Sequence, residues 1–244
     1  MTRILLALSL LATAATAQAA EMNCNVESNY DLTIDARSVI LTRETGTPKW
    51  VVIRGERLFV DDAWVNLGAA DRKRLAQFDR GAREVGPQVA QIGREAADIA
   101  FIALGEVAAG LSDDPAQTRQ RLGQARRKID ASMARSVTTT RFSSHALGED
   151  IGEAVGEVVP SLVGDIVGGA VRAAMSGDTA RLQALEGLDA KIEAQVQPRA
   201  KALEQRAEAL CSRMIELDAL EDALDYRLAD GQRLDLLKVS REAR

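Results

Sequence analysis

The hydrophobic pattern of the first part of the chain has a period of two. Apolar side chains at Val39 and Leu41 alternate with polar ones, and an extended, β-branched pattern follows from Trp50. Such alternation is typical of half-buried strands. We therefore expect an antiparallel meander with strands near residues 37–43, 49–54, 57–60 and 63–67.

Turn signals separate these expected strands. Gly46, Thr47 and Pro48 break the chain between the first pair. Gly55-Glu56 fits a two-residue hairpin turn with glycine first, and Asp61-Asp62 fits a second turn less closely.

Aromatic side chains gather in the same region, which holds both tryptophans, Trp50 and Trp64, together with Tyr30 and Phe59. Aromatics in a small sheet usually belong to the core or form a docking face for a helix. A ligand-binding cage is the alternative, but no convergent set of polar residues accompanies them. We therefore expect core or helix-docking roles.

From Ala69 onward the period changes to about three and a half. The seam consists of Leu75, Phe78, Ala82, Val85, Val89, Ile92, Ala96, Ile99 and Ala103. A coiled-coil-like helix ending near Gly110 is expected, with a kink or short break at Pro87.

A second helix should follow after a short loop. Asp113 or Asp114 can cap it, with Pro115 in its first turn. Its apolar stripe is Leu122, Ala125, Ile129, Met133 and Val137. The short loop predicts an antiparallel helical hairpin.

The last expected helix starts after Ser176-Gly177-Asp178 and carries an apolar stripe from Leu182 to Leu228. Pro198 should bend or split it. The tail after Gly231 is expected to fray.

Glycines recur at spacings of four in the central segment 146–175. They are Gly148, Gly152, Gly156, Gly164 and Gly168. Residues four apart share a helix face, and a stripe of small side chains lets another backbone approach closely. The segment is therefore interpreted as a helix-contact stripe, within the fold or between chains. A flexible linker is the alternative.

These patterns predict an α+β, helix-dominated fold with a small N-terminal antiparallel β-meander followed by long coiled-coil-like helices. The expected division is a signal peptide at 1–20, the β-meander at 21–68 and a helical region at 69–244. The helical region comprises the hairpin, the glycine-rich segment 146–175 and the C-terminal helix.

The N-terminus has the form of a secretory signal. Arg3 provides the positive end, Ile4 to Leu11 the apolar core, and Ala17-Gln18-Ala19 the small-x-small cleavage motif. Cleavage near Ala19/Ala20 would place the protein in the periplasm. A retained N-terminal anchor is the alternative, but the apolar run is short for a bilayer, which needs roughly 20 residues.

Two cysteines, Cys24 and Cys211, remain after cleavage. An even count in an exported protein favours a disulfide, and here one pairing exists. Two buried free thiols are the alternative. A redox role is disfavoured because the chain has no C-x-x-C motif.

The formal net charge of −5 argues against general nucleic-acid binding, which needs a dense basic surface. Catalysis is also disfavoured. His145 is the only histidine and lies near Ser143, Ser144 and Asp150, but neighbours in one segment cannot generally form a catalytic triad. A lone histidine also lacks companion zinc ligands. We expect no enzymatic activity, no cofactor and no metal.

Several features together resemble the YggN family of uncharacterised bacterial periplasmic proteins, a domain of unknown function. They are Cys24 just after the signal, the segment from Gly55 to Leu67, the charged helix beginning AADRKRLAQF, the glycine-rich centre and Cys211-Ser212-Arg213. The likeness covers nearly the whole mature chain. It implies a periplasmic location, no known activity, and no catalytic residue to carry over.

The function class favoured by the sequence is a structural or interaction protein of the envelope, because helical seams and small-residue faces are protein-contact devices. Its partner would be another envelope protein or a second copy of itself. A membrane-surface protein using segment 146–175 is the alternative, although that segment is acidic and such helices usually carry a basic face.

Overall fold

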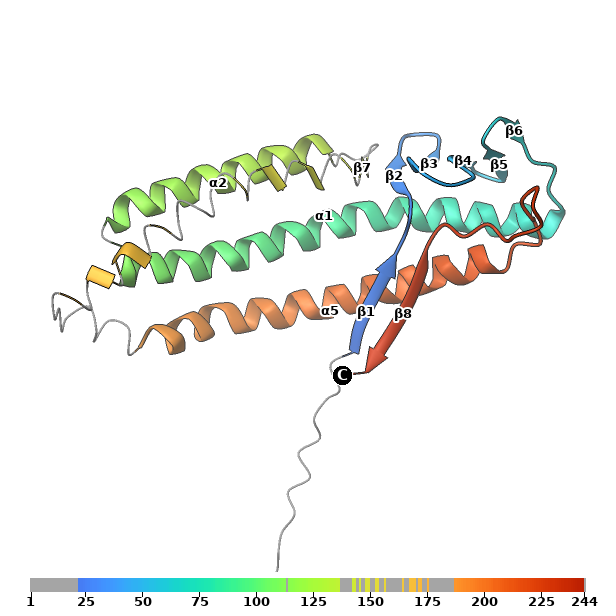
Figure 1. The fold of residues 1–244 in the computed structure, drawn as a ribbon. Coiled ribbons are helices and arrows are strands. Elements are labelled where there is room, and N and C mark those ends of the chain that lie inside the picture. The colour runs from blue at the N-terminus through green and yellow to red at the C-terminus, as the bar shows by residue number, and fades with distance from the viewer. Residues whose placement is uncertain are drawn as a thin grey trace, which may run out of the picture.

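The computed structural model describes residues 22–112, 114–136 and 187–243, together with isolated positions between 142 and 175. The predicted signal peptide lies outside the described residues. An antiparallel sheet near the N-terminus is followed by long helices, so the α+β, helix-dominated fold class is confirmed. The helices lie lengthwise beside one another, with the sheet over one end of them (Figure 1).

The long helices in the described part of the chain are α1 (Ala69–Leu111), α2 (Pro115–Ser136) and α5 (Leu188–Asp222). α1 lies between the other two and contacts both, and its first half also packs against the sheet (Figure 1). No helix in the described part of the chain is long and apolar enough to span a membrane.

Polar contacts fix α1 and α5 in antiparallel register. Far from the sheet, Glu106 forms an ion pair with Lys191 at 2.6 Å and accepts a hydrogen bond from the Gln195 amide at 2.9 Å. Nearer the sheet, Glu95 pairs with Arg206. The residue that lies later in α1 has the partner that lies earlier in α5. Antiparallel packing requires this order.

Asp71 in the first turn of α1 anchors the chain beyond the end of α5. Its carboxylate accepts the backbone N–H groups of Asp225 and Tyr226, both at 3.0 Å, and pairs with Arg74 at 2.7 Å. Burial alone would raise the pKa of Asp71, but these donors outweigh burial and hold the pKa below its usual range.

The two helices approach closely at Gly81 of α1. A Cβ added there would lie 2.7 Å from Cδ2 of Leu217 in α5. Leu217 is buried in the core, so its side chain would have to shift to make room. Glycine at this position therefore lets the two helices approach closely.

The predicted helical hairpin is confirmed. Asp114 caps α2 by accepting the N–H groups of Ala116 and Gln117, at 3.1 and 2.9 Å. Ser112 and Thr118, both buried, are hydrogen-bonded at 2.7 Å across the turn. The apolar stripe of α2 is buried against α1 at Leu122, Ala125, Ile129 and Met133.

Neither internal proline ends its helix. α1 continues through Pro87 and α5 through Pro198, so the expected break in α1 and split in α5 are wrong, while the alternative kink or bend at each proline stays a prediction. An internal proline removes one backbone hydrogen bond. In α1, packing on both sides of the proline offsets this loss, since Val85 and Ala90 are both buried.

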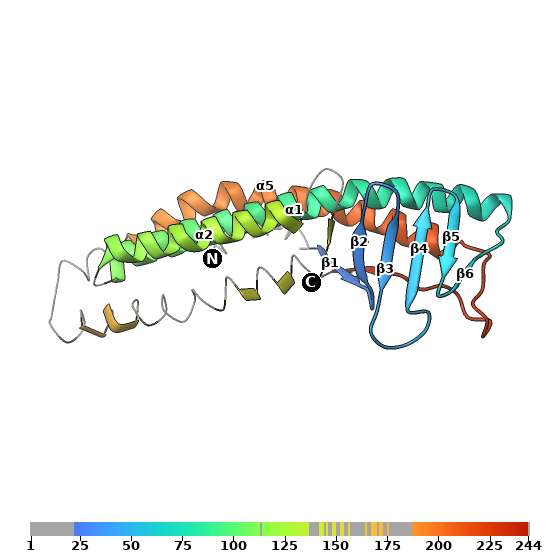
Figure 2. The same cartoon turned by 90° about the horizontal axis from the view of Figure 1, so that it is seen from above.

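The larger sheet has the order β6-β5-β4-β3-β2-β7, and its neighbouring strands are antiparallel (Figure 2). Its strands are β2 (Asp31–Ile34), β3 (Val39–Thr42), β4 (Trp50–Arg54), β5 (Arg57–Val60), β6 (Ala63–Trp64) and β7 (Phe142–Ser143). The predicted meander corresponds to β3 to β6, while β2 and β7 were not predicted.

The predicted turns occur where expected. Gly55 has φ +57° between β4 and β5, a conformation that glycine adopts without strain. Asp61, with φ 51°, turns the chain between β5 and β6. Its carboxylate accepts the N–H groups of Lys49 and Trp50, which ties this turn to the start of β4.

The end of the chain is ordered, so the expected frayed tail after Gly231 is wrong. β8 (Lys238–Ala243) pairs along its whole length with β1 (Met22–Glu27), forming a second, two-stranded sheet. Leu234, Leu236 and Leu237 are buried. This apolar cluster anchors the tail, and α5 ends at Asp222 instead of reaching Leu228.

One core joins all these parts. It includes the inner face of the sheet, the first half of α1, the last part of α5 and the C-terminal segment. In α1 the predicted seam is fully buried at its first four positions, from Leu75 to Val85, whereas Ala96 is exposed. Strands β7 and β8 come from beyond the boundary drawn near residue 68, and that domain division stays a prediction.

Gly81→Val should destabilise the protein by about 1–3 kcal/mol, because its added methyl groups would overlap buried Leu217. The matched control is Gly105→Val on the same helix, where an added Cβ would meet no described atom within 4 Å. Urea unfolding should separate the two variants. Equal midpoints would contradict the close approach at Gly81.

Candidate functional site

The outer face of the six-stranded sheet carries a row of apolar side chains in register across four strands. Ile40 of β3 lies opposite Val52 of β4, Val52 opposite Phe59 of β5, and Phe59 opposite Trp64 of β6. Trp50 stands on the same face, one pair further along β4. We call these five residues the outer aromatic face.

Both tryptophans are open to solvent. Trp50 is 56 % exposed and Trp64 is 43 % exposed, so the expected core or helix-docking role is wrong for them. The alternation along β4 explains this, because Val51 and Ile53 occupy the inner, buried side and leave Trp50 on the other. Of the four aromatics named in the expected sheet region, Tyr30 is the buried one.

Arginines are stacked on Trp64. The Arg57 guanidinium lies 3.9 Å from the ring centroid and that of Arg54 lies 6.0 Å away, while Phe59 contacts the ring edge-on with centroids 5.4 Å apart. Arg54 also donates a hydrogen bond to Ser38. Stacking orders these guanidinium groups beside the apolar row, so the face combines aromatic area with fixed positive charge.

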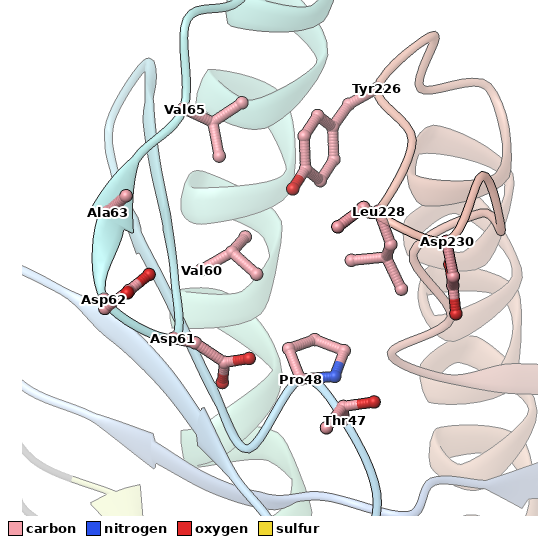
Figure 3. Close-up of a pocket in the computed structure, with 11 residues that line it drawn as sticks. Thr47, Pro48, Val60, Asp61, Asp62, Ala63, Val65, Tyr226, Leu228 and Asp230 are labelled. Atoms are coloured by element: carbon pink, nitrogen blue, oxygen red, sulfur yellow. The ribbon is translucent and has the colours of Figure 1, made fainter.

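A second candidate is a pocket of about 430 Å³ between the β5–β6 turn and the loop after α5 (Figure 3). Val60, Val65 and Leu228 supply its apolar walls, and Asp61, Asp62 and Asp230 lie around it.

Tyr226 stands over this pocket, with its hydroxyl directed into it (Figure 3). Burial, followed by the nearby Asp61 carboxylate, raises the pKa of Tyr226. Asp61 already accepts two backbone N–H groups and Asp230 accepts that of Gln232. These two carboxylates therefore have structural roles, and the pocket does not define a reaction.

A buried carboxyl group lies at the end of α5. Glu221 is 3 % exposed and accepts the Leu236 N–H at 3.3 Å. Burial, with the neighbouring carboxylates of Asp235, Asp222 and Asp218, raises the pKa of Glu221 to about 8. The carboxyl is therefore largely protonated at neutral pH.

Three of these acids form the one group in the described residues that could hold a metal ion. Ligand atoms of Asp218, Glu221 and Asp222 lie within 4.8 Å of one another. Asp218 already accepts the Val239 N–H at 2.9 Å, which ties β8 to α5. The cluster thus has a structural role in attaching the C-terminal segment.

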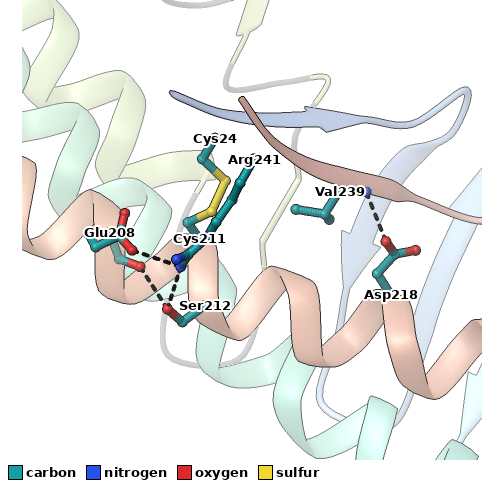
Figure 4. The surroundings of a disulfide bond; sticks show 7 residues. All are labelled: Cys24, Glu208, Cys211, Ser212, Asp218, Val239 and Arg241. Carbon is teal, nitrogen blue, oxygen red and sulfur yellow. Dashed lines mark hydrogen bonds and ion pairs between the residues drawn. A yellow bond between two sulfur atoms is a disulfide. The ribbon is translucent and has the colours of Figure 1, made fainter. Parts of the chain in front are cut away.

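The predicted disulfide between Cys24 and Cys211 is present, with Cα atoms 6.0 Å apart (Figure 4). It joins β1 to α5, and Cys211 is buried. Arg241, opposite Cys24 in the β1–β8 pair, reaches α5 and contacts Glu208 and Ser212 at 2.7 and 2.8 Å. The two-stranded sheet is therefore held on α5 by a covalent bond and by polar contacts on either side of it.

The predicted glycine stripe falls on isolated described positions, and most of segment 146–175 lies outside the described residues. An added Cβ would meet no described atom within 4 Å at four of the glycines, and at the fifth it would lie 3.6 Å from an arginine nitrogen. The open positions are Gly148, Gly152, Gly156 and Gly164, and the fifth is Gly168, next to Arg172. The helix-contact role of the stripe stays a prediction.

The residues weighed as a catalytic triad are not brought together among the described residues. His145 is exposed and lies 3.7 Å from Glu149, one helical turn away. Ser143 belongs to β7, and Ser144 and Asp150 lie outside the described residues.

Sequence reasoning missed the outer aromatic face and the buried Glu221. A signal for the face exists, because Trp50, Arg54 and Val52 share one parity along β4. The sequence does not show which of the two faces of β4 points toward the core, so this alternation alone does not identify the exposed face. For Glu221 no local signal exists, since burial depends on a segment that returns from beyond α5.

The fold and the disulfide define a helix-dominated α+β protein whose first and last strands are stapled to one long helix. The chain belongs to the family described as protein of unknown function (DUF2884), whose model matches residues 24–237. The match begins at Cys24 and includes Cys211, the described helices α1, α2 and α5, and the larger sheet. No curated protein and no solved structure matches the chain.

Removal of the disulfide should lower the free energy of unfolding substantially. A cross-link between residues 187 positions apart is worth on the order of 5 kcal/mol in the chain-entropy model. Thermal unfolding with and without dithiothreitol should show a large fall for the wild type. The Cys24→Ser/Cys211→Ser double variant is the control and should not respond to the reductant. An unchanged wild-type melting temperature would contradict the role of this bond.

Glu221→Gln should flatten the dependence of stability on pH. The folded-state pKa of Glu221 is raised, so its contribution is fully present below the unfolded pKa and is lost as pH rises through about 8. The wild type should lose roughly 3–4 kcal/mol between pH 5 and pH 8 from this group. Urea unfolding across this range measures the loss.

The matched control for this prediction is Glu193→Gln, which changes an exposed glutamate on the same helix. Its profile should run parallel to that of the wild type. A Glu221→Gln profile that also runs parallel would mean that the buried carboxyl does not titrate as expected.

Proposed function

We propose that the protein is an exported, periplasmic, non-catalytic interaction protein that binds a protein partner of the cell envelope through the outer aromatic face. The single observation that carries the proposal is the exposure of Trp50 and Trp64 beside Phe59 and the stacked Arg57. The predicted signal peptide, the disulfide and the resemblance to the YggN family support the location.

Residue chemistry favours a protein as the occupant of this face. Tryptophan and arginine are the residue types most enriched at binding hot spots, where large rigid side chains contribute area at little entropic cost. Exposed tryptophan is costly in a surface that binds nothing, because its apolar area stays in contact with water.

The charge of the outer aromatic face indicates which kind of partner surface would complement it. Arg54 and Arg57 border one side of the apolar row and present guanidinium groups that prefer carboxylates. A complementary partner surface is therefore an apolar segment flanked by acidic side chains.

A membrane-surface role for segment 146–175 is the second candidate. Val167, Val171 and Met175 lie at helical spacing and are 55, 51 and 84 % exposed, which would suit an apolar face. Flotation with liposomes distinguishes this role from the first, because binding through the sheet to a protein does not require lipid.

In vivo photo-crosslinking tests the first proposal. A photoreactive phenylalanine analogue at Trp64 should cross-link to a discrete partner, and the same analogue at exposed Arg127 on α2 should not. A second probe at Val52 should lose its cross-link when Trp50→Ser and Trp64→Ser are combined.

The tryptophan substitutions should change the melting temperature little, because exposed side chains contribute little to folding. Loss of cross-linking would therefore report on binding. Equal cross-linking from Trp64 and Arg127, or none from a folded protein in its native compartment, would refute the proposal.

A further inference from the structure

An apolar pocket of about 380 Å³ lies behind the sheet. Several parts of the chain contribute to its walls: the inner face of the larger sheet, α1, α5, the chain at the end of β1 and the chain just before β8. Its walls include Val26, Leu41, Phe78, Val85, Met214 and Leu236. It is separate from the outer aromatic face, which lies on the opposite side of the sheet.

The pocket has a buried end and an open end. Phe78, Leu217 and Leu236 are buried at one end. Val26 of β1 is 43 % exposed, and Val89 of α1 is partly exposed. The pocket is therefore accessible from solvent beside β1, and an occupant can enter without unfolding the core.

Water is a poor occupant of this space. The polar side chains in its walls are Ser28 and Tyr30. The Ser28 hydroxyl donates to the Leu236 carbonyl at 2.6 Å, and the Tyr30 hydroxyl donates to the Pro48 carbonyl at 3.2 Å. A buried water needs two to four polar partners, whereas these groups are already engaged. The lining therefore favours an apolar ligand.

The pocket extends along α1. Its wall on that helix runs from Phe78 through Ala82 and Val85 to Val89, which is about 16 Å of helix. An apolar lining of this length matches an extended hydrocarbon chain.

Length and volume agree on the size of the occupant. A methylene group is about as large as a water molecule, which takes up about 30 Å³ of liquid, so the pocket accommodates roughly a dozen carbon atoms. We propose that this pocket binds one unbranched acyl chain, with its methyl end against Phe78 and its polar end at the mouth beside Val26 and Val89. The chain is that of a free fatty acid or one tail of a phospholipid.

The disulfide shapes this site. Val26 follows Cys24 by two residues and Leu210 immediately precedes Cys211, and both side chains line the pocket. The covalent bond therefore holds β1 at a fixed distance from α5 at the mouth. This proposal does not depend on the partner-binding role of the outer face, and either can fail without the other.

Calorimetric titration of the delipidated, disulfide-intact protein tests the proposal. Affinity for saturated fatty acids should rise about fourfold for each added methylene, from hexanoate to dodecanoate. It should then level off, because further carbons remain outside the pocket. A fatty-acid affinity that does not depend on chain length would overturn the proposal.

A filling variant provides the structural test. Ala82→Leu places a larger side chain inside the pocket and should weaken dodecanoate binding at least tenfold without lowering the melting temperature. Ala96→Leu, an exposed position on the same helix, is the matched control and should bind like the wild type. Equal binding by both variants would overturn the assignment of the site.

A second variant covers the case in which Ala82→Leu fails to fold. Met214→Trp changes a partly exposed wall residue and should also weaken binding at least tenfold. A lysophospholipid with a dodecanoyl chain is titrated beside dodecanoate. The probe that binds more tightly identifies the source of the chain, a phospholipid or a free fatty acid. Binding of neither probe to the folded wild type would refute the proposal.

Discussion

The packing of α1 against α5 is the constraint on which the rest of the structure depends. The helices are far apart in sequence, yet α1 supplies the floor under the larger sheet while α5 carries the disulfide and the two-stranded sheet. They approach closely at Gly81, where an added side chain would force Leu217 to shift. If this contact were looser, both sheets would lose their shared support, because neither buries enough surface by itself.

Polar contacts at the end of α5 complete this support. Asp71 holds the chain beyond α5 by backbone N–H groups, and Glu221 and Asp218 hold the segment that returns as β8. The pKa of Asp71 is lowered and that of Glu221 is raised, because their surroundings differ. Asp71 has cationic and N–H donors around it, while Glu221 is surrounded by other acids and by apolar side chains.

Local signals in the sequence were sufficient for the elements whose partners are close along the chain. The meander from β3 to β6 and the α1–α2 hairpin were predicted because glycine, proline and a capping aspartate mark short turns. The Cys24–Cys211 bond was also predicted, from an even count of cysteines in a chain with a predicted export signal. Each of these inferences needs no knowledge of tertiary packing.

Elements that depend on distant partners were missed. β1 and β8 pair across nearly the whole chain, and neither shows a pattern that identifies the other. The tryptophans were assigned to the core or to a helix-docking face by residue type, but the side of β4 that faces α1 decides their exposure. For the same reason the pocket behind the sheet could not be foreseen, since its walls come from segments that only the tertiary fold brings together.

The pairing of β1 with β8 has a consequence for the order in which the protein can fold. During synthesis the N-terminus of the chain emerges first, so β1 is made early and its partner β8 is made last. β1 therefore remains unpaired until synthesis is almost complete. An unpaired strand edge invites association with other chains. Bringing the two ends together also requires closure of the longest loop in the molecule, which makes this step slow. Truncation after Leu237 would make that exposure permanent, leaving an otherwise folded molecule with an open edge beside its disulfide.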